Sequence, residues 1–267
     1  VELLQAFALV HDDVMDGSPT RRGHPTVWAK FIERHRDGRW QGEDRRFGEA
    51  AAILVGDIAI VMADRQLTGA TTAVRKIWDA LRTELNMGQY LDVIGTATGE
   101  ITAEGARLIM KHKTAGYTIV RPLQIGAALA GRPELADALA AHGMPLGIAF
   151  QLRDDMLGAF GDSAKTGKPV GDDLREGKPT VLLAKARGTA SATQLEVLDR
   201  VGQPNLSDHD VSAIQQVMVD TGSVAASERE TNQLLGDAIS AIESLPDHNG
   251  SQSALRALAD FVVERDT

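Results

Sequence analysis

The 267-residue chain contains no cysteine, few aromatic residues and no long apolar run. The lack of cysteine excludes disulfides, thiolate zinc sites and a cysteine nucleophile, and it fits a reducing compartment. No stretch approaches the roughly 20 apolar residues needed to span a bilayer. The chain has 37 acidic and 28 basic residues, which give a formal net charge of −9. Nucleic-acid-binding proteins, by contrast, usually carry a basic surface. We therefore expect a cytoplasmic protein with no transmembrane segment and no nucleic-acid partner.

The sequence shows strong helical periodicity. Apolar residues recur every three or four positions in almost every segment, and no strand alternation over five or more residues is evident. Aromatic residues make up only 4% of the chain, so Ala, Leu, Ile and Val must fill the interior, which suits closely packed helices. The pattern predicts one all-α domain over residues 1–267. Helices are expected at 1–16, 24–36, 47–67, 71–98, 102–112, 114–130, 133–160, 178–187, 191–202, 207–221, 223–244 and 251–265.

A cluster of carboxylates lies in the segment HDDVMDGSPTRRG, residues 11–23. Asp12 and Asp16 are four residues apart and share one helix face, with Asp13 beside them. A divalent cation would relieve the repulsion between these carboxylates and would accept their hard oxygen ligands. A solvated helix end is the alternative, although acidic residues near a helix C-terminus oppose the macrodipole. Metal binding is the favoured interpretation.

A second acidic pair lies in QLRDDMLGAFGD, residues 151–162, and is followed by KTGKPVGDDLREGKPT. Asp154 and Asp155 are set in an apolar helical context, and Gln151 lies three residues before Asp154 on the same face. Magnesium keeps few protein carboxylates and takes several phosphate oxygens, while Arg and Lys bind phosphate directly. The sequence has no P-loop motif. Paired acidic motifs with nearby basic residues therefore predict a diphosphate bound through Mg²⁺.

Three segments together resemble the motifs of the trans-isoprenyl diphosphate synthases, or polyprenyl synthetases. They are VELLQAFALVHDDVMDGSPTRRG, KHKTAGYTIVRP and FQLRDDMLGAFGDSAKTGKPVGDDLREGKPT, in the family's order and extending from residue 1 to about 187. The resemblance implies an all-α helical bundle of about ten or more helices around a deep central cavity. It also implies a homodimer that condenses isopentenyl diphosphate with an allylic diphosphate, using Mg²⁺, three ions per active site.

The resemblance implies a role for each matching residue. The proposed metal ligands are Asp12, Asp16, Asp154 and Asp155, with Asp13 in the same catalytic motif. The proposed substrate-binding residues are Arg21 for the allylic diphosphate, Arg22 and Gln5 for isopentenyl diphosphate, and the phosphate lysines Lys113, Lys168 and Lys178. Gln151 and the backbone carbonyl group of Thr114 are expected to face the developing allylic cation.

Product length is predicted from two residues that precede the first acidic motif. Phe7 and Ala8 lie about one helical turn before Asp12, on the side toward which helical side chains lean. By resemblance, an aromatic residue at the first position and a small one at the second favour geranylgeranyl diphosphate (C20), with farnesyl diphosphate (C15) second.

The sequence departs from the family pattern in two places. Gly158 occupies the position where the family often has a third aspartate. Metal binding at the second motif is therefore expected to depend on Asp154 and Asp155, with help from Asp172 or Asp173. The family's upstream Gly-Gly-Lys-x-x-Arg motif is absent, so the N-terminal helices are expected to be missing.

Two alternative functions remain open. A class I terpene cyclase would carry an Asn/Asp-x-x-Ser/Thr-x-x-x-Glu triad in place of the second Asp pair. A non-catalytic subunit of a heteromeric synthase would not need intact acidic motifs.

Overall fold

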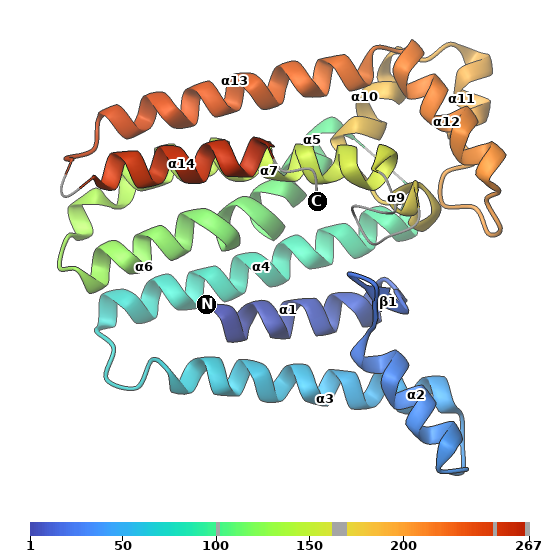
Figure 1. Ribbon diagram of the computed structural model, residues 1–267, viewed down its shortest axis with the longest axis horizontal. Coiled ribbons are helices and arrows are strands. Elements are labelled where there is room, and N and C mark those ends of the chain that lie inside the picture. The colour runs from blue at the N-terminus through green and yellow to red at the C-terminus, as the bar shows by residue number, and fades with distance from the viewer. Residues whose placement is uncertain (100–101, 162–169, 248–249, 265–267) are drawn as a thin grey trace. The chain divides into compact units, whose positions relative to one another are not determined.

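The computed structural model describes residues 1–99, 102–161, 170–247 and 250–264 (Figure 1). The described chain is built almost entirely of helices, so the predicted all-α class is confirmed. It divides into two compact units, unit 1 from Val1 to Thr71 and unit 2 from Thr72 to the C-terminal helix. Within the described residues, no helix is both long and apolar enough to cross a membrane.

Unit 1 consists of three helices and a small hairpin: α1 (Glu2–Met15), β1 (Thr20–Arg21), β2 (His24–Pro25), α2 (Val27–Asp37) and α3 (Asp44–Arg65). Both α1 and α2 pack against α3. Small residues of α3 permit this close approach, because a Cβ atom at Gly48 would lie 2.5 Å from the carbonyl oxygen of Trp28. At Gly56 it would lie 2.2 Å from Nε2 of His11. The acidic end of α1 is thus held on a firmly packed helix.

Unit 2 contains the remaining elements, which are helical. They are α4 (Thr72–Thr98), α5 (Ala103–Ile109), η1 (Met110–Val120), α6 (Arg121–Leu129), η2 (Pro133–Leu135), α7 (Ala136–Phe160), α9 (Asp172–Glu176), α10 (Val181–Thr189), α11 (Ala192–Leu198), α12 (Asp208–Asp220), α13 (Ser223–Glu243) and α14 (Ser251–Glu264). Helix α7 is central, because η1, α6, α9, α10, α13 and α14 all pack against it. Its buried residues include Leu146, Gly147 and Leu152, which face three different directions, and this is why its sequence is apolar on nearly every side.

The structure adds three elements to the helices expected from periodicity. A break between two helices was expected near residue 113. The structure is instead helical throughout this region, and the π-helix η1 joins α5 to α6. The hairpin of β1 and β2 and the short helix α9 were also not predicted. A three- to four-residue apolar period does not distinguish an α-helix from a π-helix, and a two-residue strand is too short to show alternation.

Candidate active site

The first acidic motif lies at the C-terminal end of α1. Asp12 and Asp13 belong to its last turn, and Asp16 follows as the capping residue. Gly17, at φ 67°, takes the left-handed conformation that commonly ends a helix. Asp13 is only 5% exposed, a low value for a carboxylate. The acidic side chains are therefore held at a defined helix end rather than on a frayed one.

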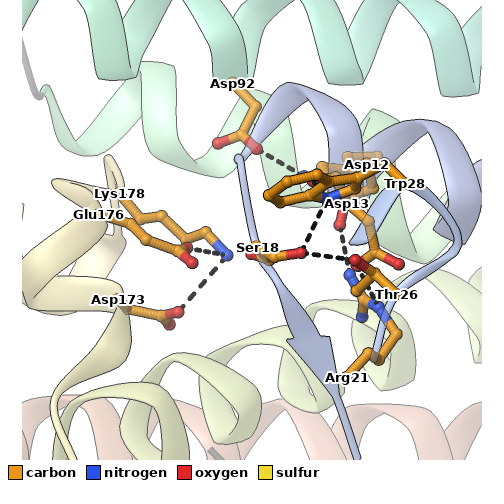
Figure 2. Close-up of polar contacts among 11 residues, drawn as sticks. Asp12, Asp13, Ser18, Arg21, Thr26, Trp28, Asp92, Asp173, Glu176 and Lys178 are labelled. Carbon is orange, nitrogen blue, oxygen red and sulfur yellow. Dashed lines mark hydrogen bonds and ion pairs between the residues drawn. The ribbon is translucent and has the colours of Figure 1, made fainter. Parts of the chain in front are cut away.

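Arg21 ties the first two carboxylates together (Figure 2). Its Nε donates to Oδ1 of Asp13 at 2.7 Å, and one terminal nitrogen donates to Oδ2 of Asp12 at 3.0 Å. Burial of Arg21 opposes its charge, but the hydrogen bond and charge of Asp13, and those of Asp12, raise its pKa overall. Arg21 thus stays cationic beside the acidic pair, so a guanidinium group, a type that binds phosphate well, is in direct contact with two carboxylates, a type that binds Mg²⁺.

The hairpin gives the two adjacent arginines different environments. Arg21 pairs with His24 across the hairpin, and Arg22 and Gly23 form the two-residue turn with φ values of 51° and 73°. Such turns, with both residues left-handed, are typical of type I′ hairpins. Arg22 is exposed at this turn, whereas Arg21 is partly buried against the carboxylates. The expected division of roles between the arginines therefore has a structural basis, although the roles themselves stay predictions.

Trp28 and Thr26 fix the link between α1 and the hairpin, and sequence reasoning missed both. The indole Nε1 of Trp28 donates to the carbonyl oxygens of Asp13, at 3.0 Å, and Ser18, at 2.9 Å. The Thr26 hydroxyl donates to the carbonyl oxygen of Ser18 at 3.0 Å. Figure 2 shows these bonds converging on the same short stretch of chain. The only available signal was a tryptophan near the acidic motif.

The predicted product-length residues lie earlier in α1. Phe7 is buried, and its ring contacts His11 edge-on with 4.6 Å between the ring centroids. Nε2 of His11 lies 3.0 Å from the carbonyl oxygen of Ile53 in α3. Ala8 and Gln5 are partly buried. Phe7 therefore has a packing role in unit 1, and its predicted influence on product length stays a prediction.

In unit 2, Lys113 and Thr114 lie within the π-helix η1. A Cβ atom at Gly88 of α4 would lie 2.3 Å from the backbone nitrogen of Lys113. At Gly147 of α7 it would lie 2.4 Å from Cα of Ala115. Two glycines on opposite neighbours thus allow close contact with this segment, which holds its backbone in place. π-Helical turns are rare in proteins and occur frequently at functional sites.

Lys113 forms an ion pair with a residue that the motifs did not indicate. Its Nζ lies 2.5 Å from Oδ2 of Asp92 in α4, and Asp92 is buried. The pair links α4 to η1 and sets the position of the ammonium group. An aspartate within the apolar stretch GQYLDVIG was the one signal that could have identified it.

A hydrogen-bonded chain connects η1 to the second acidic motif. The Thr114 hydroxyl donates to Oε1 of Gln151 at 2.5 Å, and Nε2 of Gln151 donates to Oδ1 of Asp155 at 2.8 Å. The structure thus brings together three of the residues expected to share a site. Asp154 is partly buried on the same helix. Because both ends of the Gln151 amide are engaged, its orientation is fixed.

The carboxyl group of Asp155 has a strongly perturbed pKa. Burial raises its pKa to about 8, and the negative charges of Asp173 and Asp154 act in the same direction. The hydrogen bond from Gln151 and the positive charge of Lys178 oppose this shift without reversing it. A bound cation would favour the ionised carboxylate, so the environment suits a metal ligand.

Of the remaining phosphate lysines, one is described and one is not. Nζ of Lys178 lies 2.8 Å from Oε2 of Glu176 and 3.5 Å from Oδ1 of Asp173 (Figure 2). Lys168 lies outside the described residues. Among the described residues, no three or more acidic or histidine side chains gather around a single metal position. Mg²⁺ does not require this, since one or two carboxylates together with substrate phosphates commonly hold it.

Comparison with known proteins gives a consistent result. The sequence model of the polyprenyl synthetase family matches residues 1–218. A geranylgeranyl diphosphate synthase of Mycobacterium tuberculosis (strain ATCC 25618 / H37Rv) is 34% identical over 274 residues, which cover 100% of this chain and 72% of that protein. The (2E,6E)-farnesyl diphosphate synthase of the same strain is 31% identical over 275 residues, covering 99% of this chain and 72% of that protein.

A solved structure extends the likeness to the fold. It is a geranylgeranyl pyrophosphate synthase from Corynebacterium glutamicum, complexed with isoprenyl diphosphate and magnesium, that is 41% identical with a TM-score of 0.94. The match covers 99% of this chain and 77% of that one. The chain belongs to the polyprenyl synthetase family and is a trans-prenyltransferase, as its motifs predicted.

Proposed function

We propose that this enzyme condenses isopentenyl diphosphate with an allylic diphosphate in a Mg²⁺-dependent reaction, with geranylgeranyl diphosphate as the main product and farnesyl diphosphate second. The observation that carries the proposal is the contact of Arg21 with Asp12 and Asp13. Carboxylates bind Mg²⁺, and a guanidinium group binds diphosphate oxygens bidentately. A protein that only needed a stable helix end would not gather three carboxylates there.

The residues present fit magnesium by the chemistry of their donors. Asp12, Asp16, Asp154 and Asp155 would hold it, with three ions per site. When bound, magnesium supplies positive charge that stabilises the leaving diphosphate. Arg21 would bind the allylic diphosphate, and Lys113 and Lys178 would add positive charge near it. Arg22 and Gln5 would hold isopentenyl diphosphate, and Lys168 would be a further phosphate ligand.

The reaction places a carbocation near the second motif. Gln151 and the backbone carbonyl group of Thr114 would face the allylic cation that forms when the carbon–oxygen bond to the diphosphate breaks. The double bond of isopentenyl diphosphate attacks that cation, and the released diphosphate then removes a proton to complete the condensation. Gln151 is suited to this position because the Thr114 hydroxyl and Asp155 fix its amide. Apolar helix walls would exclude the water that otherwise quenches the cation.

We also propose that the enzyme works as a homodimer in the cytoplasm. On α3, five apolar side chains are each at least 44% exposed: Ile53, Leu54, Ile58, Val61 and Met62. They lie on one half of the helix surface and together form an apolar patch. Single exposed apolar residues are common on protein surfaces, but a grouped set of this kind is typical of an interaction site. Self-association through this patch would cover it.

Replacement of one aspartate in each motif tests the proposed function. Asp12→Asn and Asp154→Asn should lower kcat by about 100-fold or more, because each removes a proposed charged ligand at the reacting diphosphate. Asp237→Asn, at an exposed site on α13, is the matched control and should leave kcat unchanged. If either motif variant keeps near-normal kcat with an unchanged thermal midpoint, the assignment of that motif is wrong.

A further inference from the structure

The side chain of His11 joins α1 to α3 within unit 1, where the two helices lie side by side (Figure 1). It is only 16% exposed, and its Nε2 lies 3.0 Å from the carbonyl oxygen of Ile53. Because a carbonyl oxygen can only accept a hydrogen bond, Nε2 carries the proton and donates it. The carboxylate of Asp57 is farther from Nε2, at 3.8 Å, and is 58% exposed. The carbonyl group of Ile53 is therefore the group that anchors the imidazole.

Gly56 of α3 makes room for this imidazole. It follows Ile53 by three residues, and helical side chains lean toward the N-terminus, so a side chain at position 56 would lie over the Ile53 carbonyl group. A Cβ atom at Gly56 would lie 2.2 Å from Nε2 and 2.3 Å from Cδ2 of His11. Even a methyl group at this position would thus displace the imidazole from the carbonyl oxygen.

The same imidazole contacts the ring of Phe7. Phe7 and His11 are four residues apart and share one face of α1. Their ring centroids are 4.6 Å apart and their planes meet at 61°, an edge-on arrangement that is favourable for aromatic rings. The ring of Phe7 is thus supported by a second ring, which a hydrogen bond fixes to α3.

We propose that His11 is a positioning residue for product length: anchored on α3 by the Ile53 carbonyl group, it holds the ring of Phe7 in the place where that ring stops the growing chain. This inference rests on the proposed function and on the predicted role of Phe7. A Phe7 ring without this support would spend part of its time in other orientations, and a longer chain would then pass it.

The competing explanation is that His11 serves only the acidic motif, since Asp12 follows it directly. Consecutive residues of a helix point about 100° apart, whereas Phe7 and His11 share a face. Arg21 already holds the carboxylates of Asp12 and Asp13. If His11 served the motif alone, its replacement would lower kcat and leave product length unchanged.

The experiment measures the ratio of longer products to the main wild-type product, by chromatography of the dephosphorylated products at equal conversion, together with kcat. His11→Ala removes both the ring and the donor, and should raise this ratio about threefold or more. His11→Gln carries its own Nε2 the same number of bonds from Cα, so it keeps the donor and should keep the ratio near that of wild type. Gly56→Ala should raise the ratio as His11→Ala does. Gly236→Ala, whose Cβ would meet no atom within 4 Å, is the matched control and should leave the ratio unchanged.

A double-mutant cycle tests whether the effect of His11 passes through Phe7. Phe7→Ala alone should raise the ratio. Addition of His11→Ala to Phe7→Ala should raise it no further, because no ring is left to hold. A general loosening of unit 1 would instead make the two effects multiply, which would overturn the inference.

The remaining outcomes separate this inference from the proposed function. An unchanged ratio in His11→Ala, or a ratio raised as much by His11→Gln, would overturn the inference while condensation activity stands. If Phe7→Ala has no effect, the inference is overturned together with the predicted role of Phe7. If either His11→Ala or Gly56→Ala does not fold, the other variant decides. Failure of the wild-type chain to form any condensation product would refute the proposed function and, with it, this inference.

Discussion

Nζ of Lys113 lies 2.5 Å from Oδ2 of Asp92, and this ion pair joins the π-helix η1 to the long helix α4. Asp92 is 8% exposed, so its carboxylate has little water to replace a lost partner. The ion pair fixes the ammonium group of Lys113, so Asp92 is a positioning residue for the role in diphosphate binding that we propose for Lys113.

Replacement of Asp92 should therefore reduce catalysis without removing a group that touches substrate. Asp92→Asn is expected to lower kcat/KM on the order of 10- to 100-fold, since small displacements of a positioned group have effects of this size. Asp79→Asn is the matched control, because Asp79 pairs with Arg82 on the same helix at an exposed position. Steady-state kinetics of both variants check this. Similar losses in the two would show that Asp92 has no special role.

The contact of Gly147 with η1 predicts a pair of glycine variants with opposite effects. Gly147→Ala would bring Cβ to 2.4 Å from Cα of Ala115, so it should cost about 1–3 kcal/mol in free energy of unfolding. Gly126→Ala, on α6 with no atom within 4 Å of the new Cβ, should stabilise by about 0.5–1 kcal/mol. Urea unfolding gives both values. A stable Gly147→Ala variant would contradict the close packing of η1 on α7.

Asp155 should make the metal-free protein less stable as pH rises. Its pKa is about 8 in the folded chain against an ordinary value of 3.8, so between these values the folded state holds a proton that the unfolded state has lost. The stability from this group is complete below pH 3.8 and is lost as pH rises to about 8. The loss is at most about 1.4 kcal/mol per pH unit.

Denaturant unfolding in EDTA at pH 6, 7 and 8 measures this effect. The wild-type free energy of unfolding should fall more steeply with pH than that of Asp155→Asn, which cannot ionise. Parallel pH profiles of the two proteins would show that Asp155 is already ionised in the folded state at pH 6.

Product length should respond in opposite directions to changes at Phe7 and Ala8. Phe7→Ala removes the aromatic ring and should shift the products beyond C20, while Ala8→Phe adds a ring and should shift them toward C15. Phe31→Leu serves as a control, since Phe31 contacts the ring of Phe47 in the same unit instead of preceding the acidic motif. Chromatography of the dephosphorylated products measures the distribution. If neither variant changes it, the end of the product site lies elsewhere.

Much of the fold was predictable because helical periodicity is strong and few other elements occur. The helix expected at 1–16 is Glu2–Met15, and that expected at 71–98 is Thr72–Thr98. The resemblance placed Thr114 and Gln151 in one site, and the structure shows a hydrogen bond between them. The sequence also indicated that Asp172 or Asp173 helps the second acidic motif. The contact of Asp92 with Lys113 was not predictable, because it depends on how two helices approach each other.

The most direct test of the central claim is to incubate the enzyme with isopentenyl diphosphate, farnesyl diphosphate and Mg²⁺ and to identify the products by mass. The proposed function predicts geranylgeranyl diphosphate as the main product, no product in EDTA, and a rate of product formation lowered about 100-fold or more when Asp12→Asn replaces the wild-type chain. A cyclic hydrocarbon would indicate a terpene cyclase. Unchanged substrates, from a folded protein in Mg²⁺, would contradict the assignment of this chain as a catalytic prenyltransferase.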